Sequence, residues 1–404
     1  MTRRGTEIAR LTCLILAGEA IFSLPFHVPR FFRQTLLSEF ALTNTALGDI
    51  FAIYGLTAML AYFPGGTLAD RYSTRALLAV SLWATAAGGL YLATIPSVQG
   101  LSFLYGYWGI TTILLFWAAL IRATREWGGA VAQGRAFGLL DGGRGLVAAV
   151  LASVAVAVLA HTMTGTDSHA DLRAVIYFYS GITFVAGVLC WWLIPRSASS
   201  PGRAHLSSVR VRSVLVQPVV WWQALIVIAA YCGYKGLDYY TLFAQQALGL
   251  RELEAAQWMT AAAYLRPLAA VAAGFCADRV GISRLVGGLF TLGAVAYLAA
   301  GASNALPEAW IAGNLLLTII AVYALRGVYF ALLEETRVAP AFTGTAVGLI
   351  SVVGYTPDVF FAPLAGRLLD GAPGLAGFQQ VFLVLAGVFA VGAWATLRLR
   401  GEER

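Results

Sequence analysis

Charged residues are scarce in this sequence. Only 12% of its 404 residues are charged, whereas 59% are hydrophobic and the mean hydropathy is +0.75. A soluble chain of this length would need several times as many charges to cover the surface of its two or three domains. The shortage therefore excludes a soluble protein and predicts an integral membrane protein.

Residues that bind metals or form disulfides are also few. The four cysteines lie in four separate apolar segments without a Cys-x-x-Cys spacing, which indicates neither a metal site nor a disulfide framework. No phosphate-binding loop, Gly-x-Ser-x-Gly turn or His-Glu-x-x-His motif occurs, and these motifs mark common nucleotide, hydrolase and metalloprotease sites. We therefore expect no cofactor, no metal and no enzymatic activity.

What the sequence has instead is long apolar segments. About 20 residues of helix cross a hydrocarbon core of roughly 30 Å, whereas a barrel strand needs only about 9 to 11. Twelve windows of the longer kind occur, at 8–29, 46–66, 75–95, 99–121, 136–160, 173–195, 219–246, 253–275, 284–303, 308–333, 343–368 and 376–397. They predict an all-α membrane protein with twelve transmembrane helices. The first window has no small-residue cleavage site, so it should be retained and not removed as a signal peptide.

The loops at the two ends of these helices differ in arginine content. One face collects 18 arginines and the other has 5. Because cytoplasmic loops are enriched in arginine and lysine, we expect both termini to be cytoplasmic. These loop arginines explain the net charge of +7 and the pI near 9.3. Nucleic-acid binding would instead gather basic residues in one soluble domain, so we expect no nucleic-acid partner.

Two short motifs recur at nearly the same distance along the chain. "GTLADR" at 66–71 returns as "GFCADR" at 274–279, and "GRAFGLL" at 134–140 returns as "GTAVGLI" at 344–350. Recurrence at one offset predicts two related bundles of six helices. The long segment rich in Ser, Pro and Arg between them predicts a cytoplasmic linker. The expected division is 1–195, linker 196–218 and 219–404.

The Gly-x-x-x-Asp-Arg pattern after the second and eighth of twelve helices resembles that of the major facilitator superfamily. The resemblance covers the whole chain and implies two six-helix bundles that rock about a midplane site, with transport driven by a gradient. It further implies a multi-pass protein of a bacterial-type inner membrane, working as a monomer in the lipid bilayer on a small-molecule substrate.

The repeated motif predicts a latch between helices at the cytoplasmic surface. A glycine lets two helices approach closely, and the aspartate can accept hydrogen bonds from a neighbouring helix start or an arginine. The alternative is that the aspartates are solvated residues that end their helices. The candidate gating residues of the two motifs are Gly66, Asp70, Arg71, Gly274, Asp278 and Arg279, and by resemblance their partners are Arg135 and Arg337.

Charges inside the helices should mark the transport pathway, because a charge that faces lipid costs at least about 2.5 to 3.5 kcal/mol. These charges are Glu19, Asp141, Arg144, Lys235, Asp238, Arg266, Arg326 and Asp358, with His27 and Arg30 as a further polar pair. The Asp141 and Arg144 pair is spaced for one helical face. This spacing predicts either a gating element or a salt bridge that only stabilises the helix.

The segment "AYCGYKGLDYY" at 230–240 contains the only lysine of the chain, Lys235. Lys235 and Asp238 share a helical face and form either a structural pair or part of a binding site. Tyrosines such as Tyr234 can donate to a polar substrate, and an ammonium suits an anion that must bind and leave. This segment is similar to that of organic-anion carriers in the same superfamily, which have basic residues in helices 1 and 7. The resemblance implies Arg30 or His27 together with Lys235.

A proton-coupling residue must be a carboxylate that can become neutral inside the membrane. Glu19 and Asp358 are the candidates because neither has a basic residue one turn away, and Asp238 beside Lys235 is a third. The alternative is that Arg144, Arg266 or Arg326 neutralises them across helices.

We therefore expect a secondary transporter that moves a small organic anion with H⁺. The alternatives are an exporter of neutral or amphiphilic compounds and a transporter-like ligand sensor. A membrane-embedded enzyme is disfavoured because no nucleophile, base and orienting group occur together at membrane depth.

Overall fold

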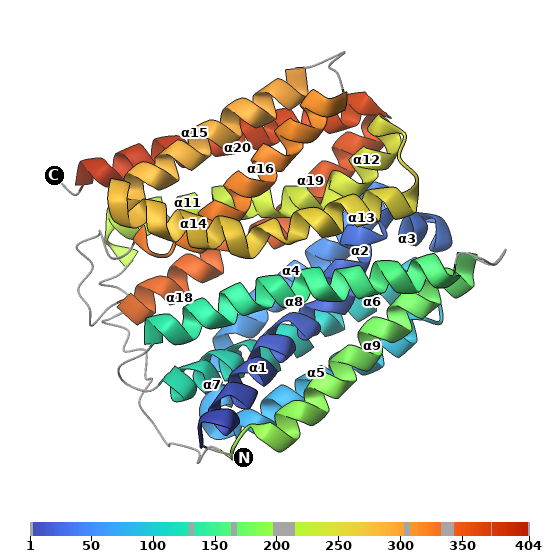
Figure 1. Ribbon diagram of the computed structural model, residues 1–404, viewed down its shortest axis with the longest axis vertical. Helices are drawn as coiled ribbons and strands as arrows, with labels where there is room; N and C mark the ends of the chain where they lie inside the picture. Colours follow the sequence, from blue (N-terminus) through green and yellow to red (C-terminus); the bar gives the residue numbers. More distant parts are fainter. Residues whose placement is uncertain are drawn as a thin grey trace. The chain divides into compact units, whose positions relative to one another are not determined.

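The computed structural model describes residues 3–128, 133–162, 168–196, 215–302, 308–332, 343–372 and 374–402, and every regular element in these ranges is a helix (Figure 1). The chain forms two compact units. The first comprises Met1–Gly202 with Leu250–Tyr264, and the second comprises Arg203–Gly249 with Leu265–Arg404. The linker predicted at 196–218 lies mostly outside the described residues.

Eleven helices in the described ranges are long and apolar enough to cross a membrane. The remaining predicted span, 219–246, is also helical, over Pro218–Gly236 and Tyr240–Leu248. This span carries the polar side chains of Gln223 and Lys235. The prediction of an all-helical membrane protein is confirmed.

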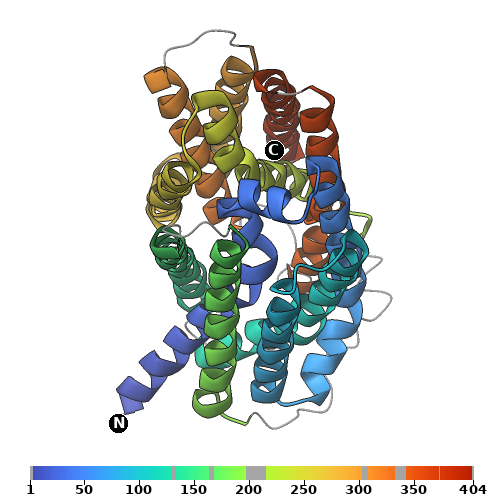
Figure 2. The ribbon, with the colours of Figure 1, turned by 90° about the vertical axis from the view of Figure 1, so that its right-hand side faces the viewer.

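The first unit contains the N-terminal spans and one short segment from later in the chain. Its helices are α1 (Arg3–Phe22), η1 (Ser23–His27), α2 (Val28–Phe31), α3 (Arg33–Glu39), α4 (Asn44–Arg71), α5 (Thr74–Leu92), α6 (Val98–Gly109), η2 (Ile110–Trp117), α7 (Ala118–Gly128), α8 (Gln133–Thr162), α9 (Ser168–Leu193) and α13 (Glu252–Ala263). The short helix α3 (blue) lies across the direction of α9 (green) in Figure 2. Although α13 follows the linker in sequence, it packs against α8 and α2.

Side-chain caps begin several of these helices. The hydroxyls of Thr43, Ser73 and Ser97 each accept a hydrogen bond from the backbone N–H three residues later. Each cap satisfies one of the backbone donors that a helix leaves unpaired in its first turn. These hydroxyl residues therefore fix where α4, α5 and α6 start.

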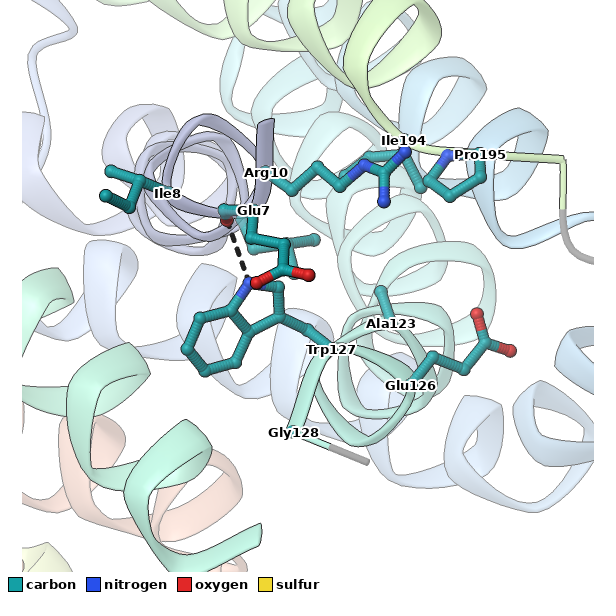
Figure 3. A pocket seen from close by; sticks show the side chains of 10 residues that line it. Glu7, Ile8, Arg10, Ala123, Glu126, Trp127, Gly128, Ile194 and Pro195 are labelled. Carbon is teal, nitrogen blue, oxygen red and sulfur yellow. Dashed lines mark hydrogen bonds between the residues drawn. The ribbon is translucent and has the colours of Figure 1, made fainter. Parts of the chain in front are cut away.

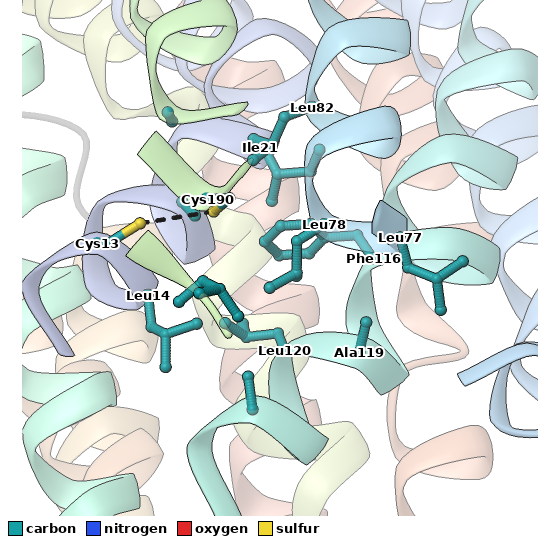
Figure 4. Packing of buried hydrophobic residues seen from close by; sticks show 14 of the residues in the cluster. Cys13, Leu14, Ile21, Leu77, Leu78, Leu82, Phe116, Ala119, Leu120 and Cys190 are labelled. Carbon is teal, nitrogen blue, oxygen red and sulfur yellow. Dashed lines mark hydrogen bonds between the residues drawn. The ribbon is translucent and has the colours of Figure 1, made fainter. Parts of the chain in front are cut away.

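Buried hydrophobic side chains from α1, α5, α7 and α9 hold one end of the first unit together (Figure 4). Leu14, Leu78 and Leu120 are at most 1% exposed. The Sγ atoms of Cys13 and Cys190 lie 3.6 Å apart inside this cluster and join α1 to α9. Burial of such side chains stabilises by roughly 1.5–3 kcal/mol each in water, but between membrane helices close packing is the larger contribution.

Two transmembrane helices of the first unit contain a π-helical segment, η1 in helix 1 and η2 in helix 4. Pro25 lies within η1 and has no N–H to donate to the preceding turn. The chain widens there, and Val28 N–H donates to Ser23 O five residues back. Single π turns of this kind re-aim side chains and often occur at functional sites.

The second unit contains α11 (Pro218–Gly236), η3 (Leu237–Tyr239), α12 (Tyr240–Leu248), α14 (Leu265–Val280), α15 (Ile282–Ala302), α16 (Glu308–Val328), α18 (Thr343–Gly354), α19 (Pro357–Gly371) and α20 (Leu375–Glu402). Helices α15 and α20 lie side by side (Figure 1). Each helix places a phenylalanine over a glycine of the other. A Cβ at Gly293 would come within 2.5 Å of Phe389, and one at Gly392 within 2.5 Å of Phe290. The glycines therefore permit the close helix approach typical of membrane bundles.

Candidate functional site

Lys235 lies between two carboxylates in the second unit. Its Nζ is 3.1 Å from Asp358 Oδ1 and 3.6 Å from Asp238 Oδ2. Lys235 is 3% exposed and Asp238 is 5% exposed. The predicted pairing of Lys235 with Asp238 is present, but the shorter contact comes from Asp358, 123 residues later in the sequence.

Breaks in two helices bring these three residues together. Helix 7 changes from α11 to the 3₁₀ segment η3 after Gly236, the residue that follows Lys235, and Asp238 is part of that segment. Helix 11 is interrupted between Gly354 and Pro357, so Asp358 lies in the first turn of α19. A cation in a last helical turn and an anion in a first turn both interact favourably with the helix dipole. Discontinuous helices of this kind form binding sites in many secondary transporters.

The glycines beside Lys235 serve packing more than bending. A Cβ at Gly233 would come within 2.6 Å of the Phe389 ring, and one at Gly236 within 2.8 Å of Leu385 Cδ1. Both contacts are with α20, and the 3₁₀ segment follows Gly236. In this structure the two glycines therefore allow a neighbouring helix to approach.

Tyrosines connect Asp358 to a second cation of the unit. Tyr231 O–H lies 3.1 Å from both Asp358 oxygens and donates to this carboxylate. Its ring stacks on Tyr234, with centroids 5.9 Å apart. The Arg326 guanidinium lies over Tyr234 at 3.9 Å from the ring centroid, a cation–π geometry. Arg326 is in the last turn of α16, so three helices contribute to this group.

We name Lys235, Asp238, Asp358, Tyr231 and Arg326 the lysine cluster. It contains two cations and two carboxylates, so it is balanced when all four groups are charged. Arg266, a further predicted cation, is buried in α14 of the same unit.

A second group of buried charges lies in the first unit around Glu19. His27 Nε2 is 3.2 Å from Glu19 Oε1, and Arg144 Nε is 3.2 Å from Glu19 Oε2. The guanidinium of Arg144 also lies 5.7 Å from the ring centroids of both Phe22 and Trp117. We name Glu19, His27 and Arg144 the glutamate cluster.

The π segments border the glutamate cluster. Phe22 precedes η1, His27 ends it, and Trp117 ends η2. The widened turn at Pro25 lies between Glu19 and His27 and so sets how their side chains meet. Close approach also matters at α1, because a Cβ at Gly18 would lie 3.1 Å from Arg144 Cδ.

Several predicted site residues are placed apart from these two clusters. Arg30 is buried in α2, whereas Asp141 is exposed on α8. The partner of Glu19 is Arg144, as one alternative from the sequence had it, whereas Lys235 contacts Asp358, for which only arginines had been considered. Sequence reasoning missed Arg33, which is fully buried and donates from Nε to Asn44 Oδ1 at 3.1 Å.

The glycines at the predicted latch differ in how closely they are packed. Among the described residues, a Cβ at Gly66 or Gly274 would meet no atom within 4 Å, whereas one at Gly65 would lie 3.1 Å from Leu114 O. Gly65 therefore permits a close approach at Leu114, and the role of Gly66 and Gly274 in a latch stays a prediction. Arg71, Asp278 and Arg279 are exposed. The side chains of Asp70 and Arg135 and the whole of Arg337 lie outside the described parts of the chain.

Arg122 is a functional candidate that the sequence left without a role. Its Nη1 donates to Ala69 O at 2.6 Å, and its Nε donates to Glu126 Oε1 at 2.8 Å. It therefore caps the carbonyl end of α4, where a cation is favoured by the helix dipole. A basic residue at the end of helix 4 was the available signal.

A pocket of about 450 Å³ lies at the ends of α1, α7 and α9 (Figure 3). Trp127 Nε1 donates to Glu7 O at 2.8 Å across this pocket, and Arg10 Nε donates to Leu193 O at 3.3 Å. The residues that line it include none of the glutamate cluster. It is therefore a separate feature of the first unit.

A sequence model of the Major Facilitator Superfamily matches residues 15–362. The chain belongs to this superfamily. It is therefore a secondary transporter that carries a small molecule across a membrane, and not an enzyme.

Two Escherichia coli proteins are similar over nearly the whole length. Inner membrane protein YqcE is 28% identical, with 95% of this chain and 91% of YqcE covered. Inner membrane protein YihN is 27% identical, with 97% of this chain and 94% of YihN covered. Both names support a multi-pass inner-membrane protein.

A solved structure of a bacterial homologue of the human lysosomal transporter Spinster has the same fold. The TM-score is 0.74 at 14% sequence identity, with 100% of this chain and 98% of the other covered. The likeness confirms the fold class predicted from the apolar segments.

Proposed function

We propose that this transporter moves a small organic anion together with a proton, and that Lys235 is the cation that the anion contacts. The observation that carries the proposal is the position of Lys235, buried at the break of helix 7 and shared between Asp238 and Asp358. A buried ammonium needs an anionic partner because desolvation of an unpaired charge is costly. A substrate anion can take the place of one carboxylate.

The charges of the lysine cluster explain why a proton should accompany the anion. With both carboxylates ionised, the two cations are already balanced, and a further anion would leave the buried cluster negative. Protonation of one carboxylate gives the cluster one spare positive charge. Anion and proton then bind together without a change in the net charge of the site.

Asp358 is the better candidate for this proton. Its side chain is 16% exposed, against 7% for Asp238, so it is more open to water. It also makes the shorter contact with Lys235, so its neutralisation frees the ammonium most directly. Tyr231 can hold the protonated carboxyl in place by the same hydrogen bond.

We propose Glu19 as a second proton site, in the first unit. A proton on Glu19 would release both Arg144 and His27 from their shared carboxylate. These two groups, and the buried Arg30 of the same unit, can then accept negative charge. The remaining candidates for substrate contact, Tyr234, Arg266 and Arg326, all lie in the second unit.

The topology and gating predictions complete the proposal. We propose that both termini are cytoplasmic, that the halves 1–195 and 219–404 alternate as a monomer, and that the 196–218 segment links them. The proposed gating residues stay those predicted from the repeats, with Arg122 added because it caps α4 beside the first motif.

Thermal stabilisation of the purified protein tests the anion proposal. The panel contains phosphorylated, carboxylated and sulfonated solutes with neutral analogues of each. A ligand at 100 times its Kd should raise the free energy of unfolding by about 2.7 kcal/mol. We expect an anion, and not its neutral analogue, to stabilise the wild type.

Three variants make the assignment specific. Lys235→Arg keeps the charge and should retain part of the response, whereas Lys235→Gln should lose it. Because Lys235→Gln leaves two carboxylates without their ammonium, the balanced variant Lys235→Gln with Asp238→Asn serves as the folded control. If that control still responds to the same anion, Lys235 is structural. If only neutral compounds stabilise the wild type, the exporter alternative replaces the anion proposal.

A further inference from the structure

An apolar groove that shares no residue with the lysine cluster lies in the second unit. Its volume is about 540 Å³, and Trp221, Trp222, Leu225, Ile228 and Val353 are among the residues that line it. This volume falls within the roughly 300–1,000 Å³ typical of small-ligand pockets. The groove is formed by the start of α11 and the end of α18.

An arginine lies one aromatic ring away from this groove. Trp222 contacts Trp394 edge to face, with ring centroids 5.1 Å apart. The Arg398 guanidinium lies over the other ring of this pair, 5.4 Å from the Trp394 centroid. Arg398 is exposed, so a ligand can reach its guanidinium.

The position of the groove along the helices points to the membrane surface. Trp221 and Trp222 lie in the first turns of α11, and Arg398 lies near the end of the span Leu375–Gly401. Tryptophans gather where the hydrocarbon core meets the headgroups. Trp221 and Trp394 are each 45% exposed, as expected of such a belt.

We propose that this groove binds the acyl chain of one anionic phospholipid, with the lipid phosphate on Arg398. The apolar lining fits a chain, the exposed guanidinium fits a phosphate, and the two features are separated by one tryptophan pair. Arginine binds phosphate through two parallel hydrogen bonds. The Trp221 indole N–H already donates to Leu215 O at 2.9 Å, so Arg398 and not this indole supplies the polar contact.

Native mass spectrometry of the delipidated full-length protein tests the site. Dioleoyl-phosphatidylglycerol is titrated against dioleoyl-phosphatidylethanolamine, and inorganic phosphate is tested separately by thermal stabilisation. We expect one phosphatidylglycerol to be retained at concentrations where phosphatidylethanolamine is lost, and no effect of phosphate alone. Equal retention of both lipids would overturn the role of Arg398, and stabilisation by phosphate alone would make the site a free-anion site.

The chain offers a matched control for the charge. Arg398→Gln and Arg400→Gln each remove one positive charge from the end of α20, but two residues of helix place these side chains about 200° apart. Arg398→Gln should weaken phosphatidylglycerol binding about fivefold, since one basic residue near an anionic surface contributes about that much. Arg400→Gln should leave it unchanged. An equal loss in both variants would mean a diffuse charge effect and would overturn the proposal.

A second variant tests the groove independently of charge. Leu225→Trp adds bulk to the lining without changing any charged group, and it should reduce phosphatidylglycerol retention with an unchanged thermal midpoint in lipid-free detergent. Retention equal to that of the wild type would mean that the acyl chain lies elsewhere. Because the groove and the lysine cluster share no residue, these results do not depend on the transport proposal.

Discussion

The buried ion pairs of the two units have opposite arrangements of charge. In the glutamate cluster one carboxylate is shared by a guanidinium and an imidazole, whereas in the lysine cluster one ammonium is shared by two carboxylates. Arg144 also rests on two aromatic rings, but Lys235 is held by carboxylates within a break of helix 7. The central residue has the opposite charge in each case. Removal of either centre should therefore leave the opposite kind of charge unpaired.

The largest effect should come from removal of the centre in the second unit. Lys235→Gln leaves Asp238 and Asp358 without their ammonium, and breaking a buried ion pair costs about 3–5 kcal/mol of unfolding free energy. Thermal or denaturant unfolding in detergent measures the loss. Addition of Asp238→Asn should restore most of it. An unchanged midpoint in the single variant would show that the carboxylates do not depend on Lys235.

A smaller effect is expected at the centre of the first unit. Glu19→Gln keeps the shape of the side chain but leaves Arg144 without a carboxylate, and loss of a hydrogen bond to a charged group costs about 1.5–3 kcal/mol. The control is Glu126→Gln, which removes an acid paired with an arginine in the same unit but 43% exposed. Exposed pairs contribute about 0–1 kcal/mol. Equal losses of unfolding free energy in the two variants would mean that Glu19 contributes no more to stability than a surface acid.

Tyr231→Phe sharpens the comparison because Tyr231 donates a hydrogen bond to the Asp358 carboxylate of the lysine cluster. Loss of this donor removes one of the groups that hold Asp358 beside Lys235, and a hydrogen bond to a charged group contributes at least about 1.5 kcal/mol. Uptake of the stabilising anion into liposomes should therefore fall about tenfold, since about 1.4 kcal/mol corresponds to a factor of ten. An unchanged uptake rate would remove Tyr231 from the coupling account.

The smallest effect should come from exchange of the arginine in the first unit for a lysine. Arg144→Lys keeps the charge beside Glu19 but loses much of the contact with Phe22 and Trp117, about 0.5–1 kcal/mol of unfolding free energy. Arg144→Gln is the comparison, because it also removes the charge and should cost more. If both variants unfold alike, the aromatic contacts and not the ion pair hold Arg144.

Much of this arrangement could be predicted from local spacing. The length of the apolar segments predicted the helices, and the spacing of three residues predicted that Lys235 lies beside Asp238. What spacing could not give is contact between distant segments. Lys235 of helix 7 meets Asp358 of helix 11, and Arg144 reaches Glu19 from α8 across to α1. These pairings depend on tertiary packing, which no interval in the sequence encodes.

The glycines show the same limit in another form. Glycine at a helix surface can mean a bend, a close contact or neither, and only the neighbouring helix decides. Gly233 and Gly236 make room for α20, Gly65 makes room for Leu114, and Gly66 makes room for nothing among the described residues. The repeated motif therefore does not indicate which of two adjacent glycines is packed.

The most direct test of the account is a count of protons bound with the anion. Calorimetric titration of the anion that best stabilises the protein, in two buffers of different ionisation enthalpy at one pH, gives the number of protons taken up. We predict about one proton per anion for the wild type and none for Asp358→Asn, which should still bind the anion. Anion binding without proton uptake in the wild type, or one proton still taken up by Asp358→Asn, would contradict the claim that Asp358 yields Lys235 to the substrate.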